Sequence, residues 1–331
     1  MLQIILHFET IKSRKMIKIL VNDGMHADGK AIMEKAGYHV DTNNIPQAEL
    51  MTRLQEYDGI IVRSATKVRK ELIDACPNLK VICRGGVGMD NIDVDYARSK
   101  GIGVYNTPAA SSQSVAELIF AHALTLSRSL QDANRNMPTS GDTEFKKLKK
   151  NYAKGTQLRG KTFGIIGFGR IGQEAARIAI GMGMNVLPAD LMIKEATIDL
   201  EVFTGQKLSV NVPVVAFDEV LAKSDYITLH VPSMDKPLIG EAEFAKMKDG
   251  VIVLNASRGG TIDEDALLAA LESGKAAGAG LDVFVGEPTP RKDILTHPKI
   301  SLTPHTGAST VEAQRNIGLE LAERLMGHFV A

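Results

Sequence analysis

Three polar residues of different types occur in chain order inside short, glycine-containing segments. Arg258 lies in the segment Asn-Ala-Ser-Arg-Gly-Gly, Glu287 in Asp-Val-Phe-Val-Gly-Glu-Pro and His305 in Thr-Pro-His-Thr-Gly-Ala. A guanidinium can hold a carboxylate through two hydrogen bonds and polarise a neighbouring carbonyl. An imidazole can take a proton from an alcohol or return it to a ketone, and a carboxylate bonded to the ring fixes its tautomer. An arginine, a glutamate and a histidine in these segments together predict proton transfer to or from a small carboxylated compound.

Each of these residues also has an ordinary structural interpretation. Arg258 alone would more often be a surface residue in a salt bridge, His305 is one of eight histidines, and Glu287 could be a solvated loop acid. Two of them, however, directly follow expected strands, at 251–255 and 300–302. In an α/β sheet, residues just past the C-terminal end of a strand face the ligand crevice. We therefore interpret Arg258, Glu287 and His305 as catalytic.

A dinucleotide site is predicted upstream of these three residues. The run Gly167-Phe168-Gly169-Arg170-Ile171-Gly172 joins an expected strand to an expected helix. Gly167 suits a tight turn, Gly169 the close approach of a pyrophosphate, and Gly172 tight packing of helix on strand. Asp190 follows at about the interval expected for the acid that binds ribose hydroxyls and repels a 2′-phosphate, which favours NAD over NADP. The alternative is a plain turn, with Asp190 capping a helix.

The elements that must position these residues follow a parallel α/β pattern, because short apolar runs alternate with helical stretches. We expect strands at 17–21, 59–63, 81–84, 103–105, 162–166, 185–188, 226–230, 251–255, 278–281 and 300–302. We expect helices at 30–36 and 70–74, from Ser111 to about Asn134, and after Ser309. The predicted fold is α/β, with two doubly wound parallel-sheet (Rossmann-like) domains and a cleft between them.

Composition narrows the class of protein further. The chain has 331 residues, a formal net charge of zero and two cysteines, Cys76 and Cys83, without metal-ligand spacing. We therefore expect no nucleic-acid partner, no membrane span, no metal, and a reduced, cytoplasmic setting. Residues 1–15 place an apolar patch before basic residues, the reverse of a signal peptide. We expect them either to come from an upstream start or to form a flexible extension.

The motifs together resemble the D-isomer-specific 2-hydroxyacid dehydrogenase family, from about Met16 to the C-terminus. By that resemblance Arg258 binds the substrate carboxylate and carbonyl, Glu287 pairs with the catalytic His305, and Asp282 faces the nicotinamide amide. The resemblance also implies a substrate domain made of 16–112 plus 306–331, an NAD domain at 113–305, and a dimer formed partly by the helix after Ser111. The cofactor contacts it implies are Gly167, Gly169, Arg170, Ile171, Gly172, Asp190, Val231, Ala256, Ser257, Asp282, Gly307 and Ala308.

Two segments of the first domain are most similar to family members that act on a phosphorylated acid. They are the run 61–67, which contains Arg63, and the run 84–93. By resemblance Arg63 and Arg84 bind the substrate phosphate, and amides of Gly85, Gly86, Val87 and Gly88 reach the carboxylate. The lysines at 146, 147, 149 and 150 could add charge from a partner subunit or form a solvated linker. Pro188, close before Asp190, departs from the family pattern.

The resemblance implies an NAD-dependent enzyme that oxidises 3-phospho-D-glycerate to 3-phosphohydroxypyruvate, the first step of serine synthesis. One alternative is a reductase of glyoxylate, hydroxypyruvate or another 2-keto acid, with the same catalytic residues and no dependence on Arg63. A second is a protein that binds NAD as a sensor without turnover. The sequence ends soon after the last expected helix, so we expect no feedback by serine through a further domain. The expected partners are a small-molecule substrate and a second copy of the chain.

Overall fold

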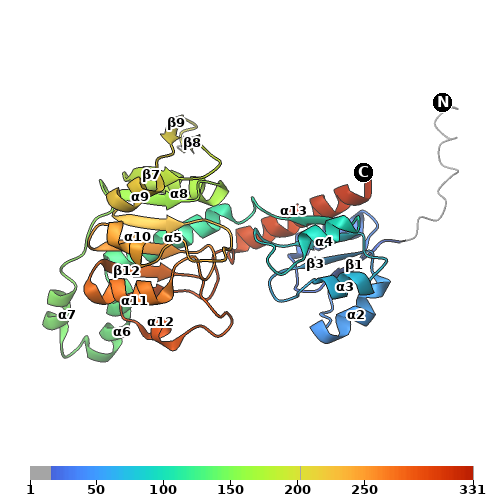
Figure 1. The fold of residues 1–331 in the computed structure, drawn as a ribbon, viewed down its shortest axis with the longest axis horizontal. Coiled ribbons are helices and arrows are strands. Elements are labelled where there is room, and N and C mark those ends of the chain that lie inside the picture. The colour runs from blue at the N-terminus through green and yellow to red at the C-terminus, as the bar shows by residue number, and fades with distance from the viewer. Residues whose placement is uncertain (1–15, 202, 331) are drawn as a thin grey trace. The chain divides into compact units, whose positions relative to one another are not determined.

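The computed structural model describes residues 16–201 and 203–330, so the extension expected at 1–15 lies outside the described residues. The chain forms two compact units (Figure 1). The first contains the residues up to Ala110 and those from Val311 onward, and the second is Ser111–Thr310. Thr306 to Thr310 therefore belong to the second unit, not to the same domain as the C-terminal helix as expected from the sequence.

The first unit is built on a five-stranded parallel sheet in the order β2-β1-β3-β4-β5. Its strands are buried because helices cover a parallel sheet on both faces, and β3 has no exposed residue. The strands are β1 (Lys18–Val21), β2 (His39–Asp41), β3 (Gly59–Val62), β4 (Val81–Arg84) and β5 (Gly103–Asn106). Four of them match the runs expected from the sequence; the three-residue β2 was missed.

Helices from both ends of the chain pack on this sheet. They are α1 (Ala27–Lys35), α2 (Leu50–Arg53), α3 (Lys70–Ala75), α4 (Val94–Ser99) and α13 (Val311–Val330), with short 3₁₀ turns at Gln47–Glu49 and Leu54–Glu56. Helix α13 contacts α1, β4 and β5, and it approaches α1 so closely that a side chain at Gly29 would meet the Gly318 carbonyl. The C-terminal helix thus completes the first unit.

The second unit contains a six-stranded parallel sheet in the order β13-β12-β11-β10-β6-β7. Its strands are β6 (Thr162–Ile166), β7 (Asn185–Ala189), β10 (Tyr226–Leu229), β11 (Val251–Asn255), β12 (Ala276–Leu281) and β13 (Ile300–Leu302). The chain runs outward from β6 to β7 and then returns to β10 on the other side of β6. This reversal is the topological switch point at which doubly wound sheets bind their ligands. The predicted α/β class with two parallel sheets is confirmed.

Most helices of the second unit pack against its sheet, but the second and third in chain order contact other helices instead, and the second lies against the first and the third. The helices of this unit are α5 (Ser112–Ser127), α6 (Leu130–Ser140), α7 (Phe145–Asn151), α8 (Arg170–Gly181), α9 (Phe217–Lys223), α10 (Glu241–Lys246), α11 (Glu264–Ser273) and α12 (Lys292–Thr296). The single helix expected from Ser111 to about Asn134 is wrong. Ser129 adopts a left-handed φ of 51°, which no α-helix accommodates, so the chain breaks there into α5 and α6.

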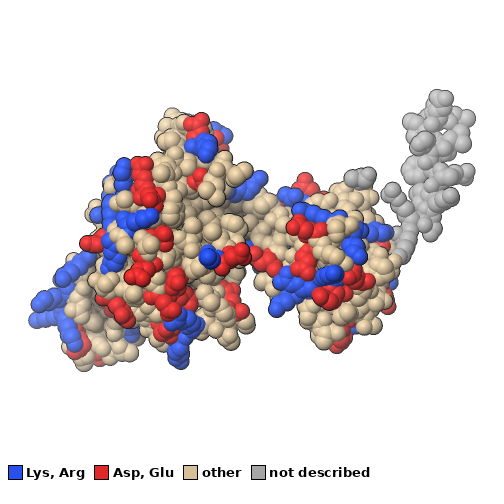
Figure 2. Space-filling view, in the orientation of Figure 1, with Lys and Arg blue, Asp and Glu red and all other residues tan. Residues whose placement is uncertain are grey.

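Two further features of this unit were not predicted. Strands β8 (Glu195–Glu201) and β9 (Lys207–Pro213) form an antiparallel hairpin beyond the edge strand β7. Pro188 lies within β7 and lacks an N–H, which an edge strand tolerates. The charged stretch read as a separator contains helix α7, and Figure 2 shows Lys and Arg side chains gathered there, where Lys146, Lys147, Lys149 and Lys150 lie.

Candidate active site

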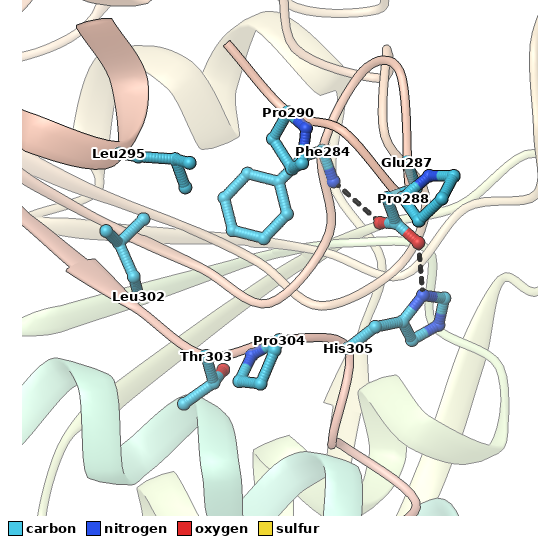
Figure 3. Close-up of a pocket in the computed structure, with 9 residues that line it drawn as sticks. All are labelled: Phe284, Glu287, Pro288, Pro290, Leu295, Leu302, Thr303, Pro304 and His305. Carbon is cyan, nitrogen blue, oxygen red and sulfur yellow. Dashed lines mark hydrogen bonds and ion pairs between the residues drawn. The ribbon is translucent and has the colours of Figure 1, made fainter. Parts of the chain in front are cut away.

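The structure brings Glu287 and His305 together in the second unit. Glu287 Oε2 lies 2.8 Å from His305 Nδ1, and Oε1 accepts the Phe284 amide at 2.9 Å. The carboxylate is therefore fixed by its own loop before it meets the ring, as Figure 3 shows. His305 is 47% exposed at its side chain, so its second ring nitrogen, Nε2, can meet a ligand. The pair has the geometry of a proton-transfer imidazole oriented by an acid.

Arg258 follows β11 and is held by a buried asparagine. The Asn255 side chain donates to the Arg258 carbonyl at 3.0 Å and to Thr261 Oγ1 at 2.9 Å, and it accepts from the Ser257 amide at 3.0 Å. Arg258 itself donates from Nη1 to the Ser257 carbonyl at 2.6 Å. Sequence reasoning quoted Asn255 within the motif but did not assign it this positioning role.

The Arg258 loop and the Glu287 loop touch through Gly259. A side chain at this glycine would collide with the backbone carbonyl of Phe284. Since β11, β12 and β13 are neighbours in a parallel sheet, the segments that follow them meet at one edge. Arg258, Glu287 and His305 therefore share one edge of the second unit's sheet.

Asp282 directly follows β12, is 1% exposed and organises the turn that carries His305. Its carboxylate accepts from Thr303 Oγ1 at 2.6 Å, the Thr306 amide at 2.7 Å and the Gly307 amide at 2.8 Å. Its carbonyl accepts the His305 amide at 2.8 Å. His305 has a φ of 54°, unusual for a residue other than glycine, and such conformations persist only where the surroundings impose them. The bonds to Asp282 supply that constraint.

An apolar cavity of about 430 Å³ adjoins the Glu287–His305 pair. Figure 3 shows Phe284, Leu295 and Leu302 around it, with Pro288 and Pro290 on the loop that carries Glu287. Apolar walls beside an ion pair limit the approach of water and strengthen the electrostatic interaction within it. The cavity is thus lined by both members of the pair and by the apolar residues of the Glu287 loop.

The glycine turn between β6 and α8 fits a dinucleotide. Gly167 has a φ of 94°, and a side chain there would lie 2.5 Å from the His230 carbonyl. A side chain at Gly172 would collide with the Gly167 carbonyl, whereas one at Gly169 would meet nothing within 4 Å. The turn therefore needs glycine at two positions for its own packing, and at Gly169 it leaves open space in front of the α8 N-terminus, where a pyrophosphate can approach backbone amides.

Asp190 directly follows β7 and is tied to this turn. Its Oδ2 accepts the Phe168 amide at 2.6 Å, and Oδ1 accepts the Met192 and Ile193 amides at 2.8 and 2.9 Å. These amide bonds outweigh the opposing effect of desolvation and lower the pKa of the carboxyl group, so it is ionised at neutral pH. Strand β8, not a helix, follows Asp190, so its bonds to Met192 and Ile193 close a turn before β8 and do not cap a helix. A carboxylate with remaining lone pairs can also accept from ribose hydroxyls.

The other expected cofactor contacts surround the switch point. Val231 follows β10 and lies near Gly167, since a side chain at that glycine would be 3.3 Å from Val231 Cγ1. Ala256 and Ser257 follow β11, and Arg170 and Ile171 begin α8. Gly307 is held by Asp282, and Ala308 lies next to it. His230 was missed: its Nδ1 is buried and has no hydrogen-bond partner among the described residues, and burial lowers its pKa to about 3.

The expected phosphate-binding residues lie in the first unit, at one edge of its sheet. Arg84 ends β4 opposite Val62, and Arg63 is the next residue after Val62. The Arg63 amide donates to Asp23 at 2.7 Å, and its guanidinium donates from Nη1 to Gln314 Oε1 on α13 at 2.7 Å. Sequence reasoning missed Gln314, because only the fold places residue 314 beside residue 63.

The segment Gly85–Gly88 is held on both sides. The Gly85 amide donates to the Val62 carbonyl at 2.8 Å, and the Gly86 amide donates to Thr107 Oγ1 at 2.8 Å. Gly86 has a φ of 130°, and a side chain there would collide with the Arg84 guanidinium. The Val87 carbonyl accepts from Asn106 Nδ2 at 2.5 Å, and Gly88 follows it. The position of the Arg84 guanidinium thus requires a glycine at residue 86 of this loop.

Comparison with known proteins agrees with this geometry. Residues 120–307 match the family described as D-isomer specific 2-hydroxyacid dehydrogenase, NAD binding domain. That stretch contains the glycine turn, Asp190 and all three candidate catalytic residues. The chain belongs to the D-isomer-specific 2-hydroxyacid dehydrogenase family. The predicted enzyme class, an NAD-dependent oxidoreductase, is confirmed, and so is NAD as the cofactor.

Relatives within the family differ in substrate. The chain is 41% identical to hydroxypyruvate reductase of Thermotoga maritima, over 93% of this chain and 97% of that one. It is also 41% identical to D-3-phosphoglycerate dehydrogenase of Archaeoglobus fulgidus, over 94% of this chain but 57% of that one. The chain thus spans little more than half of that relative. A solved glyoxylate reductase from Paecilomyes thermophila superposes with a TM-score of 0.79 at 30% identity, with 95% of each chain covered.

Among residues 16–201 and 203–330, no helix is both long and apolar enough to span a bilayer. Within the same ranges, no cluster of three or more His, Cys, Asp or Glu side chains could hold a metal ion.

Proposed function

We propose that this family member oxidises 3-phospho-D-glycerate to 3-phosphohydroxypyruvate with NAD. The observation that carries the proposal is the placement of Arg63 and Arg84 at neighbouring strand ends of the first unit. Two guanidinium groups beside a glycine loop form a site for a dianionic phosphate, because each can donate two parallel hydrogen bonds. A substrate with a single carboxylate would not need both.

The catalytic residues of the second unit divide the reaction between them. His305 Nε2 takes the proton of the C2 hydroxyl, and Glu287 stabilises the imidazolium through Nδ1 at 2.8 Å. Arg258 holds the substrate carboxylate and stabilises the partial negative charge on the oxygen that becomes the carbonyl. NAD, when bound, supplies the acceptor for the C2 hydride. Gly167, Gly169, Gly172 and Asp190 would hold the dinucleotide, and Asp282 would face the nicotinamide side through the turn at His305 to Ala308.

Reduction of hydroxypyruvate or glyoxylate is the second candidate. It is favoured by the relative from Thermotoga maritima, of which the chain covers 97%. This reaction would use the same catalytic residues in the opposite direction, with His305 donating its proton to the keto oxygen. It differs in one respect, because an unphosphorylated substrate gives Arg63 no phosphate to bind.

The two candidates separate in an assay of Arg63→Ala. We expect wild-type protein to form NADH with 3-phosphoglycerate and only weakly with D-glycerate, and the variant to lose about 10²-fold in kcat/KM on the phosphorylated acid alone. Arg69→Ala is the matched control. Arg69 is also an arginine of the first unit, but it is paired with Asp93 at 2.9 Å and should leave the preference intact. Equal activity on D-glycerate, unaffected by Arg63→Ala, would assign the protein to the reductases.

A purely NAD-sensing role predicts a different result. The protein would then bind NADH, seen by fluorescence of the reduced ring, but would turn over no 2-hydroxy acid or 2-keto acid. The proposal requires both binding and turnover.

A homodimer, expected from the family, is also proposed. Leu124, Leu130, Met137 and Phe145 expose apolar side chains along α5, α6 and α7. Exposed apolar side chains gathered on successive elements are typical of a protein–protein interface. Light scattering after size exclusion should give twice the mass of one chain, and Met137→Glu with Phe145→Glu should shift it toward the monomer.

A further inference from the structure

Helix α5 carries a buried histidine that no motif predicted. His122 is 3% exposed, and both of its ring nitrogens have partners on the segment that leads to the catalytic turn. Its Nδ1 lies 2.8 Å from Ser301 Oγ, and its Nε2 lies 3.0 Å from Thr303 Oγ1. The side chain therefore connects a helix of the scaffold with β13 and with the residue that follows β13.

The sheet is shaped to admit this ring. A side chain at Gly280, the penultimate residue of β12, would lie 2.6 Å from His122 Cβ. The glycine thus leaves the room that the imidazole fills between α5 and the strands. A ring that only filled space would not need partners at both nitrogens, and an apolar side chain would serve better in so buried a position.

The hydrogen bonds define where the protons lie. Thr303 has one hydroxyl proton, and it donates that proton to the carboxylate of Asp282 at 2.6 Å. Its oxygen must therefore accept from His122, which requires a proton on Nε2. Burial favours the neutral ring, which carries no proton on Nδ1. Nδ1 then accepts from the Ser301 hydroxyl. Burial lowers the pKa of His122 against the opposing effect of Asp282, in agreement with a neutral ring.

The chain of bonds ends at the backbone of the catalytic turn. Asp282 accepts the amides of Thr306 and Gly307 on its carboxylate, and that of His305 on its carbonyl. A carboxylate free to rotate would satisfy these amides less well, and the bond from Thr303 fixes its orientation. Thr303 in turn is held by His122, because a hydroxyl that accepts from a fixed donor has fewer directions left for its proton.

We propose that His122 is a positioning residue for the reaction, acting through Thr303 and Asp282 to fix the turn that aims His305. The inference rests on the proposed role of His305 as the base that takes the substrate proton. His122 acts on the rate of the chemical step without touching substrate, since a small misplacement of a catalytic group costs a large factor in rate.

The kinetic test is a double-variant cycle on whichever 2-hydroxy acid the wild-type protein oxidises. His122→Leu, which fills the space but cannot donate, should lower kcat about tenfold and change KM less. His122→Gln can place an amide N–H near the position of Nε2 and should recover most of the loss. In a Thr303→Val background, His122→Leu should add less than about twofold, because the path is already cut. The proposal would be overturned if the losses of kcat in His122→Leu and Thr303→Val multiplied in the double variant. It would also be overturned if His122→Gln were no more active than His122→Leu.

A matched control lies on the same helix. Ser127 is also buried, and its hydroxyl lies 2.7 Å from Tyr226 Oη, with no link to Asp282. Ser127→Ala should reduce stability and leave kcat within about twofold. If Ser127→Ala lowered kcat as much as His122→Leu does, the effect would be a general one of α5 packing.

One measurement is independent of turnover. Nitrogen-15 spectra of histidine-labelled protein should show His122 as a neutral ring protonated on Nε2, and the His305 resonances should shift in His122→Leu but not in Ser127→Ala. An Nδ1-protonated His122, or unchanged His305 resonances, would overturn the proposal. A protein that showed the expected spectra but oxidised no 2-hydroxy acid would instead overturn the proposed function.

Discussion

The Glu287 carboxylate has two hydrogen-bond partners, a backbone amide and an imidazole ring, and only the imidazole can become positively charged. One oxygen accepts the Phe284 amide, which holds the loop, and the other meets the His305 ring. A glutamine at this position can keep the loop contact through its carbonyl oxygen, but it carries no negative charge to balance an imidazolium. Shape and charge can therefore be separated at this residue.

We expect Glu287→Gln to lower kcat by about 10²-fold with little change in stability, because His305 gains a positive charge as it takes the substrate proton. Steady-state kinetics and thermal unfolding measure the two effects. Glu264→Gln is the control, since Glu264 also accepts an amide of the same loop, that of Val285 at 2.9 Å, but does not contact His305. A similar loss of kcat in Glu264→Gln would assign the effect to the loop.

Among the connecting elements, the loops after β11 and β12 depend on Gly259. Gly259→Ala should separate the loop of Arg258 from that of Glu287, because the added methyl meets a backbone carbonyl that no side-chain rotation can move. We expect kcat/KM to fall at least tenfold and the free energy of unfolding to fall by about 1–3 kcal/mol.

A control glycine in the same unit has no such neighbour. Gly181 ends α8, and a side chain there would meet nothing within 4 Å. Gly181→Ala should therefore keep full activity and be neutral or slightly stabilising. Urea unfolding with steady-state kinetics compares the two variants, and a Gly259→Ala protein as active as Gly181→Ala would contradict the role given to this contact.

Strands could be predicted from the sequence where all or most of their residues are buried. Most parallel strands are short, mainly apolar runs between helices, so runs such as 251–255 and 162–166 match β11 and β6 to the residue. The sequence failed where the local signal is weak or opposed. Ser129 lies inside an unbroken helical pattern, yet its left-handed φ ends α5. The hairpin of β8 and β9 does alternate apolar and polar residues, for example Ala196, Ile198 and Leu200, and that signal could have been used.

In the candidate site, the catalytic residues could be predicted from the sequence, but the residues that position them could not. Motifs at strand ends located Arg258, Glu287 and His305, because the fold class alone brings the ends of parallel strands together. Residues that act on those side chains from other elements carry no such signal. Gln314 lies 251 positions from Arg63, and His122 lies 181 positions from Thr303, so only the folded chain shows these pairs.

For the molecule as a whole, acid should weaken the second unit through three histidines whose pKa values are lowered in the folded chain. The pKa values of His122, His230 and His297 are lowered, chiefly by burial, and that of His230 falls from 6.5 to about 3. Below pH 6.5 the unfolded chain therefore binds protons that the folded chain does not. The free energy of unfolding must then fall as pH falls from 6.5 toward 3, by at most about 1.4 kcal/mol per pH unit for each such histidine.

Hydrogen–deuterium exchange of peptides that cover β10 should reveal this loss. We expect protection to decrease between pH 6.5 and 5, after correction for the intrinsic rate, and His230→Gln to reduce that decrease. His39→Gln, at an exposed position of the other unit, serves as control and should follow the wild-type protein. Identical pH dependence in His230→Gln and wild-type protein would exclude His230 as a source of the acid sensitivity.

The chain enters the second unit once, after Ala110, and leaves it once, after Thr310. During synthesis on the ribosome, the first unit is therefore begun first and completed last. About 200 residues of the second unit are made between the first unit's sheet and α13, the helix that covers that sheet. The second unit is contiguous and can fold as soon as it has emerged. Until α13 is made, the faces of α1, β4 and β5 that it covers are exposed, and this is the interval in which the nascent chain most needs a chaperone.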